Sequence, residues 1–108
     1  MSSGAPGARY YRVDCENGIT VDDPSEDSLH MLIGDLDGDD NTFLVLQPDA
    51  GSGSWFATVA VLEDGGFDVV RRDPERHEHE VTTETSVARI AHELTVWAAR
   101  RVRPSARV

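Results

Sequence analysis

Residues 55–71 read WFATVAVLEDGGFDVVR, and this stretch decides the fold that we expect. The apolar run at residues 55–62 is rich in β-branched and aromatic side chains and predicts a strand. Asp64-Gly65-Gly66 predicts a tight reversal, and residues 67–71 predict the returning strand of a hairpin. Apolar side chains occupy both faces of the first strand: Trp55, Ala57, Val59 and Val61 on one, and Phe56, Ala60 and Leu62 on the other.

Further strands are expected on both sides of this hairpin. Residues 42–46, TFLVL, predict a buried strand that ends before Pro48-Asp49 and a Gly-Ser-Gly-Ser loop. Residues 9–15 and 19–21, joined by an Asn17-Gly18 turn signal, predict a second hairpin. Residues 76–81 predict a last strand, whose alternation would place His77, His79 and Val81 on one side.

A first helix is predicted after residue 23. Asp23 is the expected N-cap, with Pro24 at the first helical position and Glu26 bonding back to the cap. Gly38 is the expected C-cap. The helical stripe that would face the core consists of Leu29, Leu32, Ile33 and Leu36.

A second helix is predicted near the C-terminal end of the chain. Thr82, Thr83 and Thr85 are its expected cap, and Arg100 and Arg101 would complement its dipole. Its apolar positions hold helical spacing for three turns: Val87, Ile90, Ala91, Leu94, Trp97 and Ala98.

These elements predict an α+β fold, an antiparallel sheet of about five to six strands with two helices packed on one face. A chain of 108 residues fits one domain. We expect this domain at residues 9–102, after a disordered N-terminal tail at 1–8 and before a basic C-terminal tail at 103–108.

The composition is acidic, with 20 Asp and Glu against 10 Arg and a formal net charge of −10. Such a charge repels phosphate backbones and anionic headgroups, so we expect neither nucleic acid nor a membrane as partner. The absence of lysine excludes a Walker phosphate loop and Schiff-base catalysis. Cys15 is the lone cysteine, and no signal peptide or membrane span is evident, so we expect a cytoplasmic protein.

The acidic stretch GDLDGDDN at residues 34–41 partly matches a calcium-binding loop. Asp35, Asp37 and Asp39 satisfy positions 1, 3 and 5 of such a loop. Position 6 is Asp40 where glycine is needed, and position 12 is Leu46 where glutamate is needed. A solvated loop between a helix and a strand is therefore the favoured interpretation.

The pair His77 and His79 could share a zinc ion if both point to one side of a strand. Further ligands are then required, and His30 and His92 lie off the apolar stripes of their helices. A polar outer strand that discourages edge pairing is the favoured alternative.

No motif in the sequence clearly matches a catalytic site, and we expect no enzyme and no cofactor. Ser52 and Ser54 lie in a glycine loop that is not the strand-turn-helix setting of a nucleophile. Cys15, in an expected strand, fits an inert core thiol.

The second apolar face of the central strands allows two interpretations, because two helices cover only one face. Either sheet twist and the N-terminal hairpin close the second face, with Trp55 in the core, or the face docks a basic partner.

The chain resembles a known family in the order of its segments. They are ITVDDPSEDSLHMLIGDLDGDDNTFLVLQ, SWFATVAV, GGFDVV and a C-terminal helix with SVARIAHELTVWA. Across residues 19–99 this order is similar to an actinobacterial family of immunity proteins from polymorphic toxin systems, often encoded beside deaminase-type toxins. The resemblance implies stoichiometric inhibition of a toxin by binding, without turnover.

The expected partner contacts are Asp37, Asp39, Asp40, Trp55, Phe56, Glu63 and Asp64. The alternative is a small-molecule or metal-binding accessory protein that uses the second sheet face, with His77 and His79 as polar groups. A homodimer that buries this face against itself is a third possibility.

Overall fold

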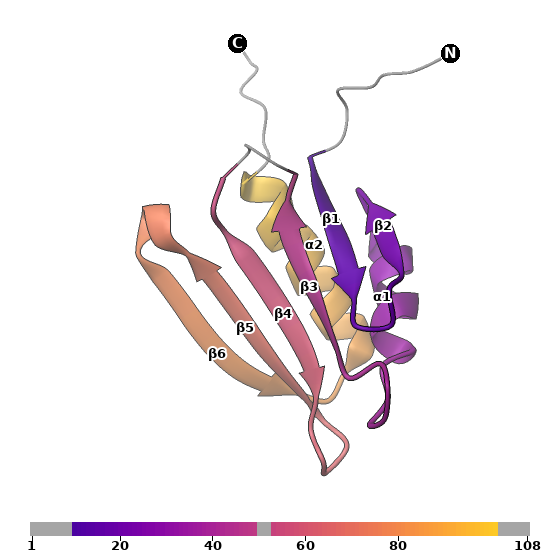
Figure 1. The fold of residues 1–108 in the computed structure, drawn as a ribbon. Coiled ribbons are helices and arrows are strands. Elements are labelled where there is room, and N and C mark those ends of the chain that lie inside the picture. Colours follow the sequence, from indigo (N-terminus) through magenta and orange to yellow (C-terminus); the bar gives the residue numbers. More distant parts are fainter. Residues whose placement is uncertain (1–9, 50–52, 102–108) are drawn as a thin grey trace, which may run out of the picture.

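The computed structural model describes residues 10–49 and 53–101, so the predicted tails at 1–8 and 103–108 lie outside the described residues. Six strands form one antiparallel sheet in the order β2-β1-β3-β4-β5-β6. They are β1 (Tyr11–Cys15), β2 (Thr20–Asp22), β3 (Phe43–Pro48), β4 (Phe56–Val61), β5 (Phe67–Asp73) and β6 (Glu78–Glu84). The helices α1 (Glu26–Gly34) and α2 (Val87–Arg101) both lie behind this sheet in Figure 1. The predicted α+β fold is confirmed.

The core forms between the helices and one face of the sheet. Strand alternation places every second residue on this face, and the pairing brings Val13 opposite Leu46 and Leu46 opposite Ala57. The buried sheet residues are Val13, Cys15, Leu44, Leu46, Trp55, Ala57, Val59, Phe67 and Val69. The helices contribute Leu29, Ile33, Ile90, Ala91, Leu94 and Ala98 to the same cluster.

Helix α1 begins later than expected, at Glu26 instead of Pro24. Ser25, not Asp23, is the N-cap, and its hydroxyl accepts a hydrogen bond from the Ser28 amide at 3.0 Å. The Asp23 carboxylate instead accepts the backbone N–H groups of Tyr10 and Tyr11 at 2.9 and 3.2 Å, which ties the end of β2 to the start of β1. The helix also ends at Gly34, with Asp35 as C-cap, so the predicted cap at Gly38 is wrong.

Helix α2 is capped by Ser86, whose hydroxyl accepts a hydrogen bond from the Arg89 amide at 3.1 Å. The predicted threonine cap is wrong, because Thr82 and Thr83 belong to β6. Threonine suits a strand, and the serine directly before the apolar stripe is the better cap.

The last strand begins at Glu78, not at residue 76. Pro74–Arg76 form a short 3₁₀ turn, η2, and His77 follows it in the left-handed region with φ 57°. Proline favours the first position of such a turn because its φ is fixed and its missing N–H is not needed there. The alternation that was expected to align His77 with His79 therefore does not reach His77.

Ion pairs add to the apolar contacts that attach α2 to β5 and β6. Arg101 donates to the buried Asp73 carboxylate at 2.9 Å, to the Glu78 carboxylate and to the Trp97 carbonyl at 2.9 Å. Its guanidinium also lies 3.9 Å from the centre of the Trp97 ring. The contact with the last-turn carbonyl agrees with the dipole role expected for Arg101.

Candidate functional site on the open sheet face

The sheet face opposite the helices, here called the open face, carries an apolar stripe. Cross-strand pairing aligns Val45 with Thr58, Thr58 with Val70, and Val70 with Val81 across four strands. The stripe consists of six apolar residues and one threonine: Phe43, Val45, Phe56, Thr58, Ala60, Val70 and Val81. Phe43 is 39% exposed and Val81 is 57% exposed, the other members are half-buried, and within residues 10–49 and 53–101 no helix covers this face (Figure 1).

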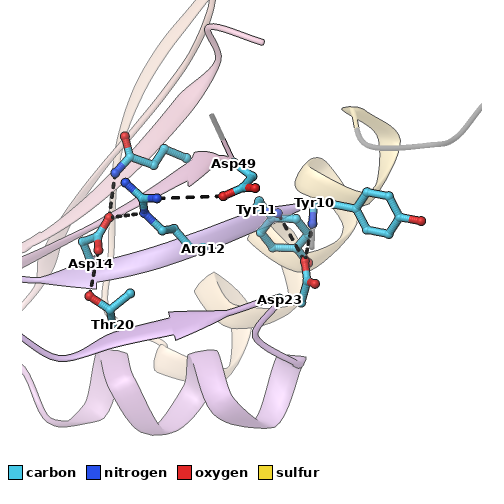
Figure 2. Close-up of polar contacts among 8 residues, drawn as sticks. Tyr10, Tyr11, Arg12, Asp14, Thr20, Asp23 and Asp49 are labelled. Carbon is cyan, nitrogen blue, oxygen red and sulfur yellow. Dashed lines mark hydrogen bonds and ion pairs between the residues drawn. The ribbon is translucent and has the colours of Figure 1, made fainter. Parts of the chain in front are cut away.

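A polar cluster borders the stripe on the β1 side (Figure 2). At its centre the Asp14 carboxylate accepts hydrogen bonds from Arg12 Nε at 3.0 Å, Gln47 Nε2 at 2.6 Å and Thr20 Oγ1 at 2.9 Å. Burial alone would raise the pKa of Asp14, but these three donors outweigh it and hold the pKa below its usual value. The hydrogen bond that Arg12 donates to Asp14 and the negative charge of Asp14 raise the pKa of Arg12. Three of the roughly four acceptor positions of the Asp14 carboxylate are thus occupied.

Asp49 lies on the other side of Arg12 and is much less engaged. Its carboxylate is 3.9 Å from Arg12 Nη1, too long for a direct hydrogen bond (Figure 2). Asp49 also lines a groove of about 420 Å³ at the end of the open face where β3 finishes and β4 begins. The groove is lined by Val45, Gln47, Pro48, Asp49, Gly53, Ser54, Trp55, Phe56 and Thr58.

The opposite end of the sheet is acidic. Residues 13–70 contain fourteen Asp and Glu and no Lys or Arg. The β1–β2 turn, the α1–β3 loop and the β4–β5 hairpin meet at this end, where the Val61 amide donates to the Thr42 carbonyl at 2.9 Å. The acidic end, as we call it, consists of the exposed residues Glu16, Asp35, Asp37, Asp39, Asp40, Glu63 and Asp64.

Two of these carboxylates organise the acidic end. Asp37 Oδ1 accepts the backbone N–H groups of Asp39, Asp40 and Asn41 at 2.8 to 3.2 Å, and these bonds lower the pKa of Asp37. Glu16 accepts the Thr42 amide and hydroxyl at 2.8 and 2.7 Å, which lowers the pKa of Glu16. The Asp37 oxygen of the proposed calcium loop is therefore directed at its own backbone.

The expected partner contacts fall into three places. Trp55 is 5% exposed and packs edge-on against Tyr11 and Trp97, with ring centroids 6.1 and 5.5 Å apart, so it belongs to the core and is not a surface contact. Phe56 lies on the open face beside the groove. The remaining five, Asp37, Asp39, Asp40, Glu63 and Asp64, lie together at the acidic end.

The histidines expected as polar groups do not line the groove. His79 lies on the open face opposite Arg72, while His77 precedes the strand. In the part of the chain that the structure describes, no three His, Cys, Asp or Glu side chains gather in a way that could hold a metal ion. The same part contains no helix long and apolar enough to cross a membrane.

Cys15 is buried, and burial together with the charges of Asp14 and Asp35 raises the pKa of its thiol. A raised pKa keeps the thiol protonated near neutral pH and lowers its nucleophilicity.

Sequence reasoning missed the cluster around Arg12. Its members come from three strands, and Gln47 is 33 residues away from Asp14. Alternation in residues 11–15 and 43–48 places Arg12 and Asp14 on one face of a strand and Gln47 on the same face of its neighbour. That signal could have identified the cluster only if the pairing of the two strands had been known.

Comparisons with protein-family models, curated protein sequences and solved structures found no match for the chain. The resemblance to the immunity family therefore stays a prediction.

Proposed function

We propose that the protein is a non-catalytic, immunity-type inhibitor that binds a partner toxin through its open face and occludes it. The observation that carries this proposal is the apolar stripe, which neither helix covers and whose members Phe43 and Val81 are exposed (Figure 1). Exposed apolar patches that are rimmed by polar residues are typical of protein-binding surfaces. Phe43 and Phe56 are suited as anchors, because aromatic side chains dominate the affinity of many interfaces.

The charge distribution favours a basic partner over a second copy of this chain. Two copies would each bring a net charge of −10 to the contact, which opposes association. A basic toxin domain would instead be attracted by the acidic end, and such steering raises the association rate. Enzymes that act on nucleic acids need positive charge at their substrate site, so they fit this requirement.

An inhibitor of this kind must meet the toxin in the cell that makes both proteins. We therefore assign the protein to the cytoplasm, as part of the same proposal.

Co-expression tests this function directly. The test needs the C-terminal toxin domain of a protein encoded next to this chain. This toxin domain would be expressed in a bacterial host with and without the chain. We expect the chain to restore growth and to form a complex of defined stoichiometry by light scattering. Growth that stays arrested while both proteins are folded would contradict the proposal.

Matched substitutions then test the open face. Phe43→Ser removes an exposed aromatic side chain from the stripe, and we expect it to weaken binding at least about tenfold. Met31→Ser is the control, because Met31 is 67% exposed but lies on α1, in the helix layer. Equal loss of binding in both variants would argue against the open face.

Salt dependence tests the role of the acidic end. Raising the salt from about 50 to about 500 mM shortens the Debye length from roughly 14 to roughly 4 Å. The association rate constant, measured by stopped flow, should fall by about tenfold or more. An association rate that does not respond to salt would rule out acidic steering.

Two other outcomes would replace this function. A small molecule retained through purification and detected by native mass spectrometry would favour an accessory binding protein. A stable dimer by light scattering, lost in Phe43→Ser, would favour self-association through the open face.

A further inference from the structure

We infer that the groove beside Phe56 receives a lysine or arginine side chain of the partner, with Asp49 as the group that recognises its charge. This inference rests on the proposed function, since it names the chemistry of the partner at one end of the open face. The groove has a volume of about 420 Å³ and lies at the end of the sheet away from the acidic loops.

The two carboxylates beside Arg12, Asp14 and Asp49, differ in the number of hydrogen-bond acceptor positions that remain free. Asp14 accepts three hydrogen bonds and holds the Arg12 Nε atom at 3.0 Å. The Asp49 carboxylate accepts no hydrogen bond from any described residue, and its nearest cation is Arg12 Nη1 at 3.9 Å. A carboxylate has about four acceptor positions, so Asp49 can take a bidentate guanidinium or an ammonium group.

The other walls of the groove suit the stem and the head of a basic side chain. Val45, Pro48 and Phe56 provide apolar and aromatic surface for methylene groups. A planar guanidinium can also stack on the Phe56 ring. Gln47 uses its Nε2 atom to bind Asp14, which leaves its carbonyl oxygen as a second acceptor beside Asp49.

The positive charges nearby do not occupy this position. Arg12 donates its hydrogen bond to Asp14, and its Nη1 atom lies 3.9 Å from Asp49 without donating a hydrogen bond to it. Arg72 on β5 lies opposite Phe56 on β4 but does not line the groove. The groove itself therefore contains one carboxylate and no cation among the residues that line it.

An NMR titration with N-acetyl-arginine amide tests the inference without the toxin. We expect fast-exchange shifts of backbone amides at Val45, Gln47, Asp49, Phe56 and Thr58, with a dissociation constant in the millimolar range. N-acetyl-lysine amide should shift the same amides, and N-acetyl-aspartate amide should not. Binding of the aspartate derivative instead would overturn the inference and assign the groove to anions through Arg12 and Arg72.

Two substitutions identify the groups responsible. Asp49→Asn should weaken binding of the arginine derivative about fivefold or more, because a charge-assisted pair is lost. Phe56→Val should weaken it as well, because it removes the aromatic ring, while valine still suits a strand. Asp27→Asn is the control, since it removes the same charge from an exposed position on α1 and should leave the shifts unchanged. Equal weakening by Asp27→Asn would show attraction by net charge alone and would overturn the inference.

The same variants separate this inference from the proposed function. If the toxin binds the wild-type chain and Asp49→Asn equally well, the inference fails and the function stands. If the arginine derivative occupies the groove but no toxin domain binds, the groove remains a basic-residue site and the function fails.

Discussion

A single carboxylate, Asp37, shapes the loop between α1 and β3. It accepts three consecutive backbone N–H groups, and the Asp37 amide donates in turn to the Asn41 carbonyl at 2.9 Å. Asn41 is 5% exposed and its Nδ2 atom donates to the Asp35 carbonyl at 3.2 Å. The exposed aspartates at this end are thus presented by a loop with its own hydrogen bonds.

Asp37 should make the stability of the fold depend on pH in the acid range. Its pKa is lower in the folded state than its ordinary value of 3.8, so its contribution is present above pH 3.8. This contribution is lost as the pH falls through the folded pKa. Asp37→Asn keeps an acceptor oxygen but has no charge and cannot titrate, so we expect it to be less stable than the wild type at pH 7, about equally stable at pH 2.5, and therefore to lose less stability between pH 4 and pH 2.5. Urea midpoints across this range provide the measurement.

Asp39→Asn is the matched control for this prediction. The Asp39 side chain forms no hydrogen bond within the described ranges, so this variant should keep the acid dependence of the wild type. If Asp37→Asn also keeps the full acid dependence, the three backbone bonds do not contribute as proposed.

Gly53 occupies a backbone conformation that other residues rarely adopt. Its φ is 143°, and a Cβ atom there would lie 3.2 Å from Trp55 Cδ1 and 3.4 Å from Trp55 Nε1. Gly53→Ala should therefore destabilise the protein by about 1 to 3 kcal/mol, through strain and contact with the indole. Thermal unfolding checks this, with Gly38→Ala as control because a Cβ at Gly38 meets nothing within 4 Å. A melting temperature equal to that of the control would refute the strain at Gly53.

At the scale of elements, α2 is joined to the β5–β6 hairpin by a row of arginine ion pairs. Arg71 lies 3.1 Å from Glu80 and 3.9 Å from Glu93, and Arg89 lies 3.7 Å from Glu84. The Arg101–Asp73 pair is the buried member, with side chains 4% and 5% exposed. Exposed pairs contribute little, whereas breaking a buried pair leaves an uncompensated charge.

Arg101→Met should destabilise the protein by about 3 kcal/mol or more, because Asp73 would lose its closest cation inside the fold. Arg76 Nε remains 3.7 Å from Asp73 and compensates only in part. The double variant Arg101→Met with Asp73→Asn should be less destabilised than the sum of the two single variants. Urea unfolding measures all three.

Arg100→Met is the control for this pair. Arg100 is the neighbouring residue on α2, is exposed and forms no ion pair with the described residues, so its loss should cost less than about 0.5 kcal/mol. Equal costs at the two positions would mean that the buried pair does not anchor α2.

On the scale of the whole molecule, charge is distributed unevenly. Fourteen acidic residues and no Lys or Arg lie in residues 13–70, whereas eight of the ten arginines lie after residue 70. The acidic end therefore repels itself, whereas the ion pairs of Arg71 and Arg101 lie toward the other end of β5. Added salt should therefore weaken the repulsion at the acidic end, which stabilises the fold, and weaken the ion pairs, which destabilises it.

Added sodium chloride should raise the melting temperature of the free protein between about 20 and about 500 mM, because screening relieves the repulsion. Over the same range it should weaken binding to a basic partner. Differential scanning calorimetry measures the first effect. A melting temperature that falls with salt would show that the exposed ion pairs outweigh the repulsion.

Local patterns in the sequence were sufficient to predict the elements and their order. The apolar stripe of Leu29 and Ile33 predicts α1, Ile90 and Leu94 predict α2, and the Asp64-Gly65-Gly66 turn predicts the β4–β5 hairpin. These signals span a few residues, so helical spacing and turn chemistry decide them without the rest of the chain. The predicted helix caps and the start of β6 were wrong, because Ser25 and Ser86 cap the helices and Pro74 begins a turn.

The sequence by itself determined the fold class, the acidic charge and the surplus of apolar residues on the central strands. Only the tertiary structure decided that Trp55 is buried in the core and that Phe56 lies on the open face. It also decided that Asp14 accepts three hydrogen bonds and that Asp49 accepts none from the described residues. The physical reason is that these properties depend on strands distant in sequence, whose pairing sets the neighbours of each side chain.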